Sequence, residues 1–221
     1  MSRLLFAKEG SAIYISHLDL MRVFQRSFRR AGLMLKHTQG FTPHAMVSIA
    51  LPLSVGVSSQ CELLDYELAE GFSVPAREVA ERLNRALPAG IRVLRAYDGG
   101  RKIRELQYLR AVITMEYDRG VPDGASEDLE ALFKRESLLM DKQSKRSGLT
   151  QVDILPLIRE LAVERKDENT LLIHCTICAQ NPSLNPAMLP AAVEKYAPEL
   201  RPDFSFIHRE NVLCADLSPF R

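Results

Sequence analysis

The chain has 221 residues, of which 46% are hydrophobic and 26% charged, and its net charge is +1. This composition is typical of a packed globular protein and excludes intrinsic disorder. No apolar run approaches the roughly 20 residues of a transmembrane helix, and the apolar run 4–7 is too short for a signal peptide, so we expect a cytoplasmic protein with no membrane contact.

Positive charge is concentrated at the start of the chain. Residues 1–44 hold seven Lys or Arg residues against two acidic ones, a net charge of +5, which leaves −4 for the rest. Three of the five histidines, His17, His37 and His44, lie in the same segment. A basic segment with histidines in a nearly neutral protein predicts a site for an anion.

The first hundred residues predict the element order β-α-β-β-α-β. Strand patterns cover 3–16, with a turn at 9–11, then 33–37 continuing at 45–53 after a loop, then 61–69 and 90–97. Helical patterns cover 17–31 and 73–87. This order is that of a ferredoxin-like unit.

The same order recurs more loosely in the second half. Strands are expected at 105–118, within 149–165, at 169–180 and at 203–214, and helices at 126–136 and, despite Pro190, at 185–197. The pair Gly99–Gly100 and the basic residues after it interrupt the pattern. We therefore predict an α+β fold of two tandem ferredoxin-like (βαββαβ) units with antiparallel sheets, a domain at 1–99 and a more divergent one at 105–221.

The four cysteines do not predict a disulfide framework in a chain of this length. Cys175 and Cys178 form a C-x-x-C, but they lie in a predicted strand, where an offset of three places side chains on opposite faces. Buried thiols are therefore expected, and we predict neither a metal site nor a cofactor.

The helix predicted at 17–31 has well-specified ends. Ser16 and Asp19 form a capping-box pattern, and Gly32 stands where a left-handed C-cap is expected. The residues expected to face the core are Leu18, Met21, Phe24, Phe28 and Ala31.

The opposite side of this helix carries Arg22, Arg26, Arg29 and Arg30, with Asp19 as the local counter-charge. Arginines four residues apart repel each other by about 0.2–0.5 kcal/mol per pair, so the face is not optimised for stability. One interpretation is an ordinary solvated face. The other is a surface for an anion, with RNA phosphate as the preferred ligand, because guanidinium groups bind phosphate in a bidentate manner.

Two further features extend the candidate site. His17 lies in the first helical turn, where a neutral imidazole would serve as a general base or simply as a structural hydrogen bonder. In the loop 40–44, the Gly40 amide and His44 would cradle a phosphate and Phe41 would stack on a base, unless Phe41 covers the core. Glu62 and Asp65 in the next strand would weaken the anion site if they paired with the arginines.

Three sequence blocks resemble a known family: S-H-L-D-L at 16–20, R-x-x-x-R-x-x-R-R at 22–30 and G-F-x-P-x at 40–44. They are similar to the radical SAM-associated, or radical SAM-linked, bacterial domain of unknown function, most closely over 3–98. The resemblance implies a radical SAM protein as partner. The C-x-x-x-C-x-x-C motif of radical SAM enzymes is absent from the sequence, so the chain would be the accessory partner.

These observations favour an accessory, substrate-binding module that holds RNA, such as tRNA or rRNA, or another anionic substrate for a radical SAM enzyme. Enzymatic activity is not expected in that case. One alternative is a metal-independent endoribonuclease of the tandem ferredoxin-like type, with His17 or His44 as the catalytic group. A second alternative is a protein–protein adaptor. The predicted anion-binding residues are His17, Arg22, Arg26, Arg29, Arg30, Gly40, Phe41 and His44.

Overall fold

A computed structural model describes the backbone of residues 1–144 and 148–221. The chain divides into two compact units, Met1–Ile103 together with Arg221, and Arg104–Phe220. Within the described residues, no helix is both long and apolar enough to cross a membrane.

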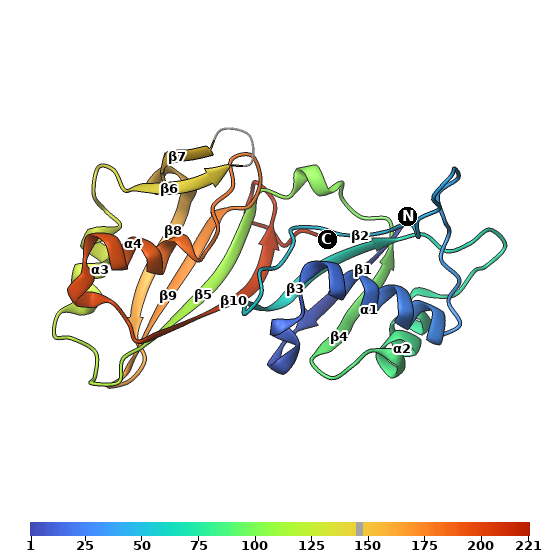
Figure 1. Ribbon diagram of the computed structural model, residues 1–221, viewed down its shortest axis with the longest axis horizontal. Helices are drawn as coiled ribbons and strands as arrows, with labels where there is room; N and C mark the ends of the chain where they lie inside the picture. Colours follow the sequence, from blue (N-terminus) through green and yellow to red (C-terminus); the bar gives the residue numbers. More distant parts are fainter. Residues whose placement is uncertain (145–147) are drawn as a thin grey trace. The chain divides into compact units, whose positions relative to one another are not determined.

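The first unit has the predicted element order β-α-β-β-α-β (Figure 1). Its elements are β1 (Ser2–Lys8), the 3-10 helix η1 (Gly10–Tyr14), α1 (His17–Arg30), β2 (Val47–Ile49), β3 (Ser58–Tyr66), α2 (Ala76–Ala86) and β4 (Ile91–Asp98). The strands pair in the order β4-β1-β3-β2, and each neighbouring pair is antiparallel.

Three of the predicted strand segments in this unit are wrong in extent. Residues 10–14 form η1 instead of extended strand. Residues 33–37 contribute only isolated bridges, Leu35 with Leu68 and His37 with Ala45. The extended segment predicted at 45–53 shortens to β2, because Leu51 adopts a left-handed φ of 48° and Pro52 follows it.

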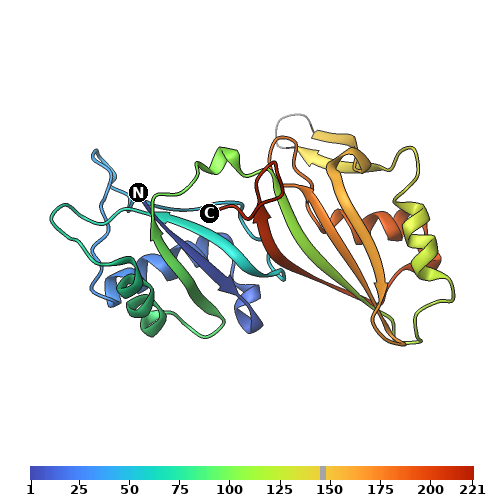
Figure 2. The ribbon, with the colours of Figure 1, turned by 180° about the vertical axis from the view of Figure 1, so that it is seen from behind.

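Both helices of the first unit cover the same face of its sheet, as Figures 1 and 2 show from opposite sides. The core between them includes an edge-to-face pair of Phe6 and Phe24 with ring centroids 4.7 Å apart. The prediction that Leu18 faces this core is wrong, since Leu18 is 67% exposed and Leu20 is buried instead. Six residues separate Leu18 from Phe24, which at about 100° per residue turns Leu18 about 120° away from the buried side.

The second unit contains four strands in one sheet and a separate hairpin. Its elements are β5 (Tyr108–Glu116), α3 (Ala125–Leu132), β6 (Leu139–Ser144), β7 (Gly148–Asp153), β8 (Ile158–Arg165), β9 (Thr170–Cys178), α4 (Met188–Tyr196) and β10 (Phe204–Leu213), with 3-10 helices at Leu155–Leu157 (η3) and Pro198–Leu200 (η4). A further 3-10 helix, η2 (Ile103–Glu105), begins at the last residue of the first unit's main segment. The sheet order is β10-β5-β9-β8, and β6 pairs with β7 alone. All these pairs are antiparallel, which confirms the predicted α+β class with antiparallel sheets.

The sequence did not predict the β6–β7 hairpin. The segment 149–165 was expected to be partly extended as a single element, but η3, with Pro156 in its first turn, separates β7 from β8. The helix at 185–197 was expected despite Pro190, and α4 confirms it. Pro190 is the third helical residue, where the amide has no acceptor within the helix, so the missing N–H costs no hydrogen bond.

Candidate functional site

The ends of α1 are fixed by local hydrogen bonds. The Ser16 hydroxyl accepts a bond from the Asp19 amide at 3.2 Å and donates one to the Asp19 carboxylate at 2.7 Å. At the other end Gly32 has a φ of +67°, its amide donates to the Arg29 carbonyl at 3.1 Å, and the Leu33 amide donates to the Phe28 carbonyl at 2.9 Å. This is a Schellman motif, and both predicted caps are confirmed.

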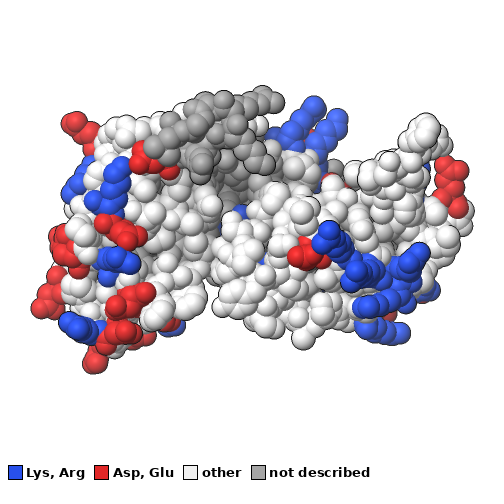
Figure 3. Space-filling model, in the orientation of Figure 1, with Lys and Arg blue, Asp and Glu red and all other residues white. Residues whose placement is uncertain are grey.

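We call Arg22, Arg26, Arg29 and Arg30 the arginine face; all four are exposed. Figure 3 shows blue side chains gathered over the region of α1 and α2. Asp19 pairs with Arg22 at 2.8 Å. The pKa of the Asp19 carboxyl is lowered, first by the hydrogen bond from Ser16, then by that from Arg22, with a smaller effect of the Arg26 charge.

The other three arginines of this face have no carboxylate partner within the part of the chain that the structure describes. On the neighbouring helix α2, by contrast, two arginines are paired with glutamates. There Arg77 pairs with Glu81 at 3.0 Å, and Arg82 pairs with Glu78, each four residues apart. Three arginines of α1 therefore lack a carboxylate partner in the described chain, compared with Arg85 alone on α2.

Asp65 does not neutralise the arginine face. Its carboxylate binds the buried Arg3 side chain, with 3.0 Å between Arg3 Nη2 and Asp65 Oδ2. Asp65 therefore pairs with Arg3 and not with the arginine face, so it does not weaken the anion site.

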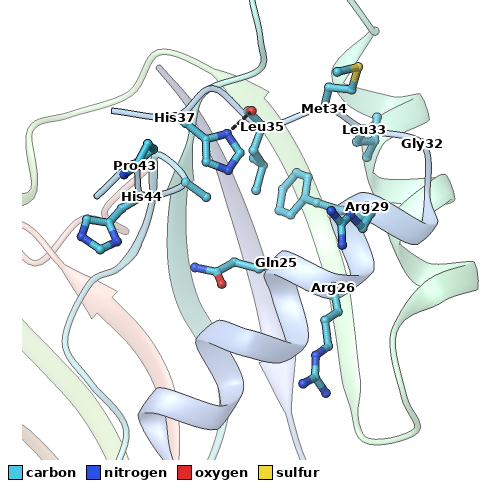
Figure 4. A pocket seen from close by; sticks show the side chains of 12 residues that line it. Gln25, Arg26, Arg29, Gly32, Leu33, Met34, Leu35, His37, Pro43 and His44 are labelled. Atoms are coloured by element: carbon cyan, nitrogen blue, oxygen red, sulfur yellow. Dashed lines mark hydrogen bonds between the residues drawn. The ribbon is translucent and has the colours of Figure 1, made fainter. Parts of the chain in front are cut away.

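A groove of about 570 Å³ runs beside the arginine face, and we call it the α1 groove. One wall is α1, and the other is the segment 32–45 that follows it (Figure 4). Its lining residues are Gln25, Arg26, Phe28, Arg29, Gly32, Leu33, Met34, Leu35, His37, Pro43, His44 and Ala45. The groove therefore combines an apolar lining with two guanidinium groups and two imidazoles.

Backbone hydrogen bonds hold the second wall in place. The Ala69 amide donates to the Met34 carbonyl at 2.8 Å, and the Lys36 amide donates to the Glu67 carbonyl at 2.9 Å. The loop closes on itself through the Thr38 amide, which donates to the His44 carbonyl at 2.8 Å. The groove is thus preformed by main-chain bonds and does not depend on a ligand for its shape.

The polar groups of the groove differ in direction. His37 Nδ1 donates to the Leu35 carbonyl 3.1 Å away, which leaves Nε2 as an acceptor when the ring is neutral. Figure 4 shows the Gln25 side chain pointing from α1 toward the segment that carries His37, while the Arg26 side chain points away from that segment. The groove thus offers two exposed hydrogen-bonding side chains on one side of α1 and a cation on the other.

The structure brings together only part of the predicted site. Arg26, Arg29 and His44 line the groove, whereas the lining does not include His17, Arg22, Arg30, Gly40 or Phe41. His17 is half-buried at the start of α1, and its Nδ1 atom is buried with no hydrogen-bond partner in the described residues.

The loop beyond the groove carries an exposed aromatic side chain at its tip. Gly40 has a φ of +131°, a backbone conformation that glycine adopts readily and other residues rarely do. Phe41 is fully exposed, which excludes the alternative that it covers the core.

Sequence reasoning missed Gln25 and Met34 as groove residues. Gln25 lies four residues before Arg29 on the same side of α1, so an uncharged polar residue at the margin of the arginine face was the available signal. Met34 is 63% exposed directly after the C-cap, where the sequence suggested only the start of a strand.

The C-x-x-C pair lies in β9 as predicted. Cys175 is buried and Cys178 half-buried, and burial raises the pKa of the Cys175 thiol to about 12. Among the described residues there is no group of three or more His, Cys, Asp or Glu side chains placed to hold a metal ion.

Two of the similar solved structures have chains about twice as long as this one. A chain of a Cbf5-Nop10-Gar1 complex has 11% sequence identity and a TM-score of 0.50, with 96% of this chain and 48% of that chain covered. A chain of the archaeal box H/ACA sRNP Nop10-Cbf5 complex has 10% identity and a TM-score of 0.47, with 94% and 46% covered. This chain therefore spans about half the length of either one, and the likeness concerns the fold alone.

An unknown protein from Galdieria sulphuraria matches with 8% identity and a TM-score of 0.27, over 94% of this chain and 96% of that one. No curated protein matches the sequence. A protein family described as uncharacterized and conserved in bacteria (DUF2344) matches residues 2–186, and the chain belongs to that family.

Proposed function

We propose that this protein is an accessory module that holds RNA on the arginine face and the adjoining α1 groove, and presents it to a radical SAM enzyme in the cytoplasm. The observation that carries the proposal is the set of three exposed arginines without a carboxylate partner in the described chain, next to a preformed groove. The surface costs stability in the free protein, and a bound polyanion would offset that cost.

Arginine chemistry supports a phosphate ligand. Every basic residue in α1 is Arg, whose planar guanidinium matches phosphate oxygens in a bidentate geometry that Lys lacks. Arg29 and Arg30 lie in the last turn of α1, where a helix favours positive charge. They can therefore remain there without a protein counter-charge.

RNA is preferred over an acidic protein surface because of the groove and the loop tip. A protein carboxylate patch would need only the cations, whereas the groove adds apolar walls, an amide and an imidazole. The fully exposed phenyl ring of Phe41 offers a stacking surface, which nucleobases use and carboxylates do not.

The finer fold assignment is also a proposal. The strand order β4-β1-β3-β2 of the first unit and β10-β5-β9-β8 of the second are what two ferredoxin-like units would give, with β6–β7 as an insertion between α3 and β8. We propose that they are the two domains expected at 1–99 and 105–221.

The test is a fluorescence-anisotropy titration with a labelled single-stranded RNA. A triple variant with Arg26→Gln, Arg29→Gln and Arg30→Gln should bind at least ten-fold more weakly than the wild type. The control loses the same charge elsewhere on exposed arginines, through Arg77→Gln, Arg119→Gln and Arg159→Gln. Equal affinity of the triple variant and the control would contradict the proposal.

The radical SAM partner rests on the resemblance of the three sequence blocks and needs its own test. Affinity purification of the tagged protein from its host, after nuclease treatment, should recover a radical SAM protein. Recovery of a partner through the arginine face, with no RNA binding by the purified protein, would favour the adaptor alternative.

A second candidate function is metal-independent RNA cleavage. The observation that favours it is that His37 and His44 both line the groove beside Arg26 and Arg29, so an acid, a base and cations lie near one another. His17, the other predicted catalytic histidine, is not a lining residue. RNA cleavage in EDTA that His44→Ala abolishes would support this function, and cleavage that survives both His44→Ala and His17→Ala would refute the predicted roles.

A further inference from the structure

We infer that the α1 groove is a site for one unpaired nucleotide of a single-stranded RNA, with the base inside the groove and a flanking phosphate on the arginine face. This inference rests on the proposed RNA-binding function and deepens it: the protein would read unpaired bases, whereas arginines alone would bind any RNA. It concerns Gln25, Met34 and His37, which the arginine pattern does not explain.

The dimensions and lining of the groove suit a nucleobase. Its volume of about 570 Å³ falls among the roughly 300–1,000 Å³ that small-molecule sites occupy. Met34, Leu35 and Pro43 supply apolar surface for the flat faces of a base. Met34 is 63% exposed, an apolar area that a base would cover.

Two side chains are placed to bond the edge of that base. Gln25 projects from α1 into the space between the walls, and its amide both donates and accepts (Figure 4). His37 is oriented by the bond between its Nδ1 and the Leu35 carbonyl, and Nε2 is an acceptor whenever the ring is neutral. One amide and one imidazole are the kind of groups that read an exposed Watson–Crick edge.

The charge around the groove fits the sugar–phosphate backbone of the same nucleotide. Arg26 and Arg29 belong both to the groove and to the arginine face, so an apolar and a cationic surface meet along one helix. The next base along the strand would find Phe41, which is fully exposed at the tip of the adjoining loop.

Double-stranded RNA does not satisfy this arrangement. In an A-form duplex the base faces are stacked and the Watson–Crick edges are paired, so neither the groove walls nor the Gln25 amide would be used. Only the arginine face would contact a duplex, through its phosphates. A preference for single strands is therefore the consequence that separates this inference from general RNA binding.

The experiment compares a labelled 12-nucleotide single-stranded RNA with the same strand in a duplex, by fluorescence anisotropy at fixed salt. Wild-type protein should bind the single strand at least ten-fold more tightly. Gln25→Leu and Phe41→Ala should each weaken single-strand binding about ten-fold without changing its salt dependence. Gln151→Leu, an exposed glutamine on β7, is the matched control and should have no effect.

Three outcomes would overturn the inference. Equal affinity for both forms of RNA, reduced by the arginine substitutions and not by Gln25→Leu, would refute the nucleotide site and leave the proposed function intact. Binding to neither form would refute both. Tight binding of polyglutamate with no RNA binding would identify an acidic protein as the occupant.

Discussion

Replacing one arginine of the arginine face should stabilise the protein while it weakens RNA binding. Arg26 is four residues from both Arg22 and Arg30, and each like-charge pair costs about 0.2–0.5 kcal/mol. Arg26→Gln removes both repulsions together with a weaker attraction to Asp19, so the free energy of unfolding should rise by at most about 0.4–1 kcal/mol. Arg26→Glu also creates two attractive pairs, which brings the gain to about 0.8–2 kcal/mol at low salt.

The assay is urea unfolding followed by far-UV circular dichroism at low salt and again in 1 M NaCl, where screening should remove most of the gain. Arg77→Gln on α2 is the control of opposite sign, because it breaks the pair with Glu81 and should cost about 0.3–0.5 kcal/mol. A loss of stability in Arg26→Gln would show that Arg26 makes a stabilising contact, and would refute the view that the arginine face is held for a ligand.

Three further measurements check the local structure on which the site depends. Gly32→Ala should lower the free energy of unfolding in urea by about 1–2 kcal/mol, because the φ of +67° disfavours alanine even though nothing would clash with the added Cβ. Gly32→Asn should lower it less, and equal losses for the two variants would exclude a left-handed C-cap. Cys178 should react first with a thiol reagent at pH 8 and Cys175 only after unfolding, since burial raises the Cys175 pKa to about 12, and a fast phase that survives Cys178→Ser would contradict the burial pattern. Burial raises the pKa of Tyr66 in the folded protein from 10 to about 12. The neutral Tyr66 side chain therefore stabilises the fold fully below pH 10, and this contribution is lost as the pH rises toward 12. Tyr66→Phe should reduce the loss of unfolding free energy at alkaline pH, and an unchanged loss would contradict the burial of Tyr66.

The features of α1 that depend on neighbouring residues could be predicted from the sequence. The ends of α1 follow from Ser16, Asp19 and Gly32, because a cap is an interaction between residues three to five positions apart. The exposure of the arginine face follows from helical periodicity. The same periodicity, at about 100° per residue, places Leu18 on the side of α1 that carries Gln25 and not on the side of Phe24, which agrees with its exposure.

The rest depended on contacts between distant segments. The segment 33–37 has a strand-like pattern, but a strand also needs a partner of matching length, and Leu35 and His37 find only single bridges. The α1 groove exists because the segment 32–45 is tied to residues 67–69 by main-chain bonds. Met34 therefore became a site residue through tertiary structure, and the position of Gln25 beside Arg29 on α1 gained a meaning only when this second wall was in place.

The salt dependence of RNA affinity tests the central claim most directly. The logarithm of the association constant of a single-stranded RNA should fall linearly with the logarithm of salt concentration, with a slope of about −0.7 per phosphate contact. Removing the charges of Arg26, Arg29 and Arg30 together should make the slope less negative by about 2, while the control lacking Arg77, Arg119 and Arg159 keeps the wild-type slope. A wild-type affinity that does not change with salt, or a slope that the arginine substitutions leave unaltered, would contradict the account.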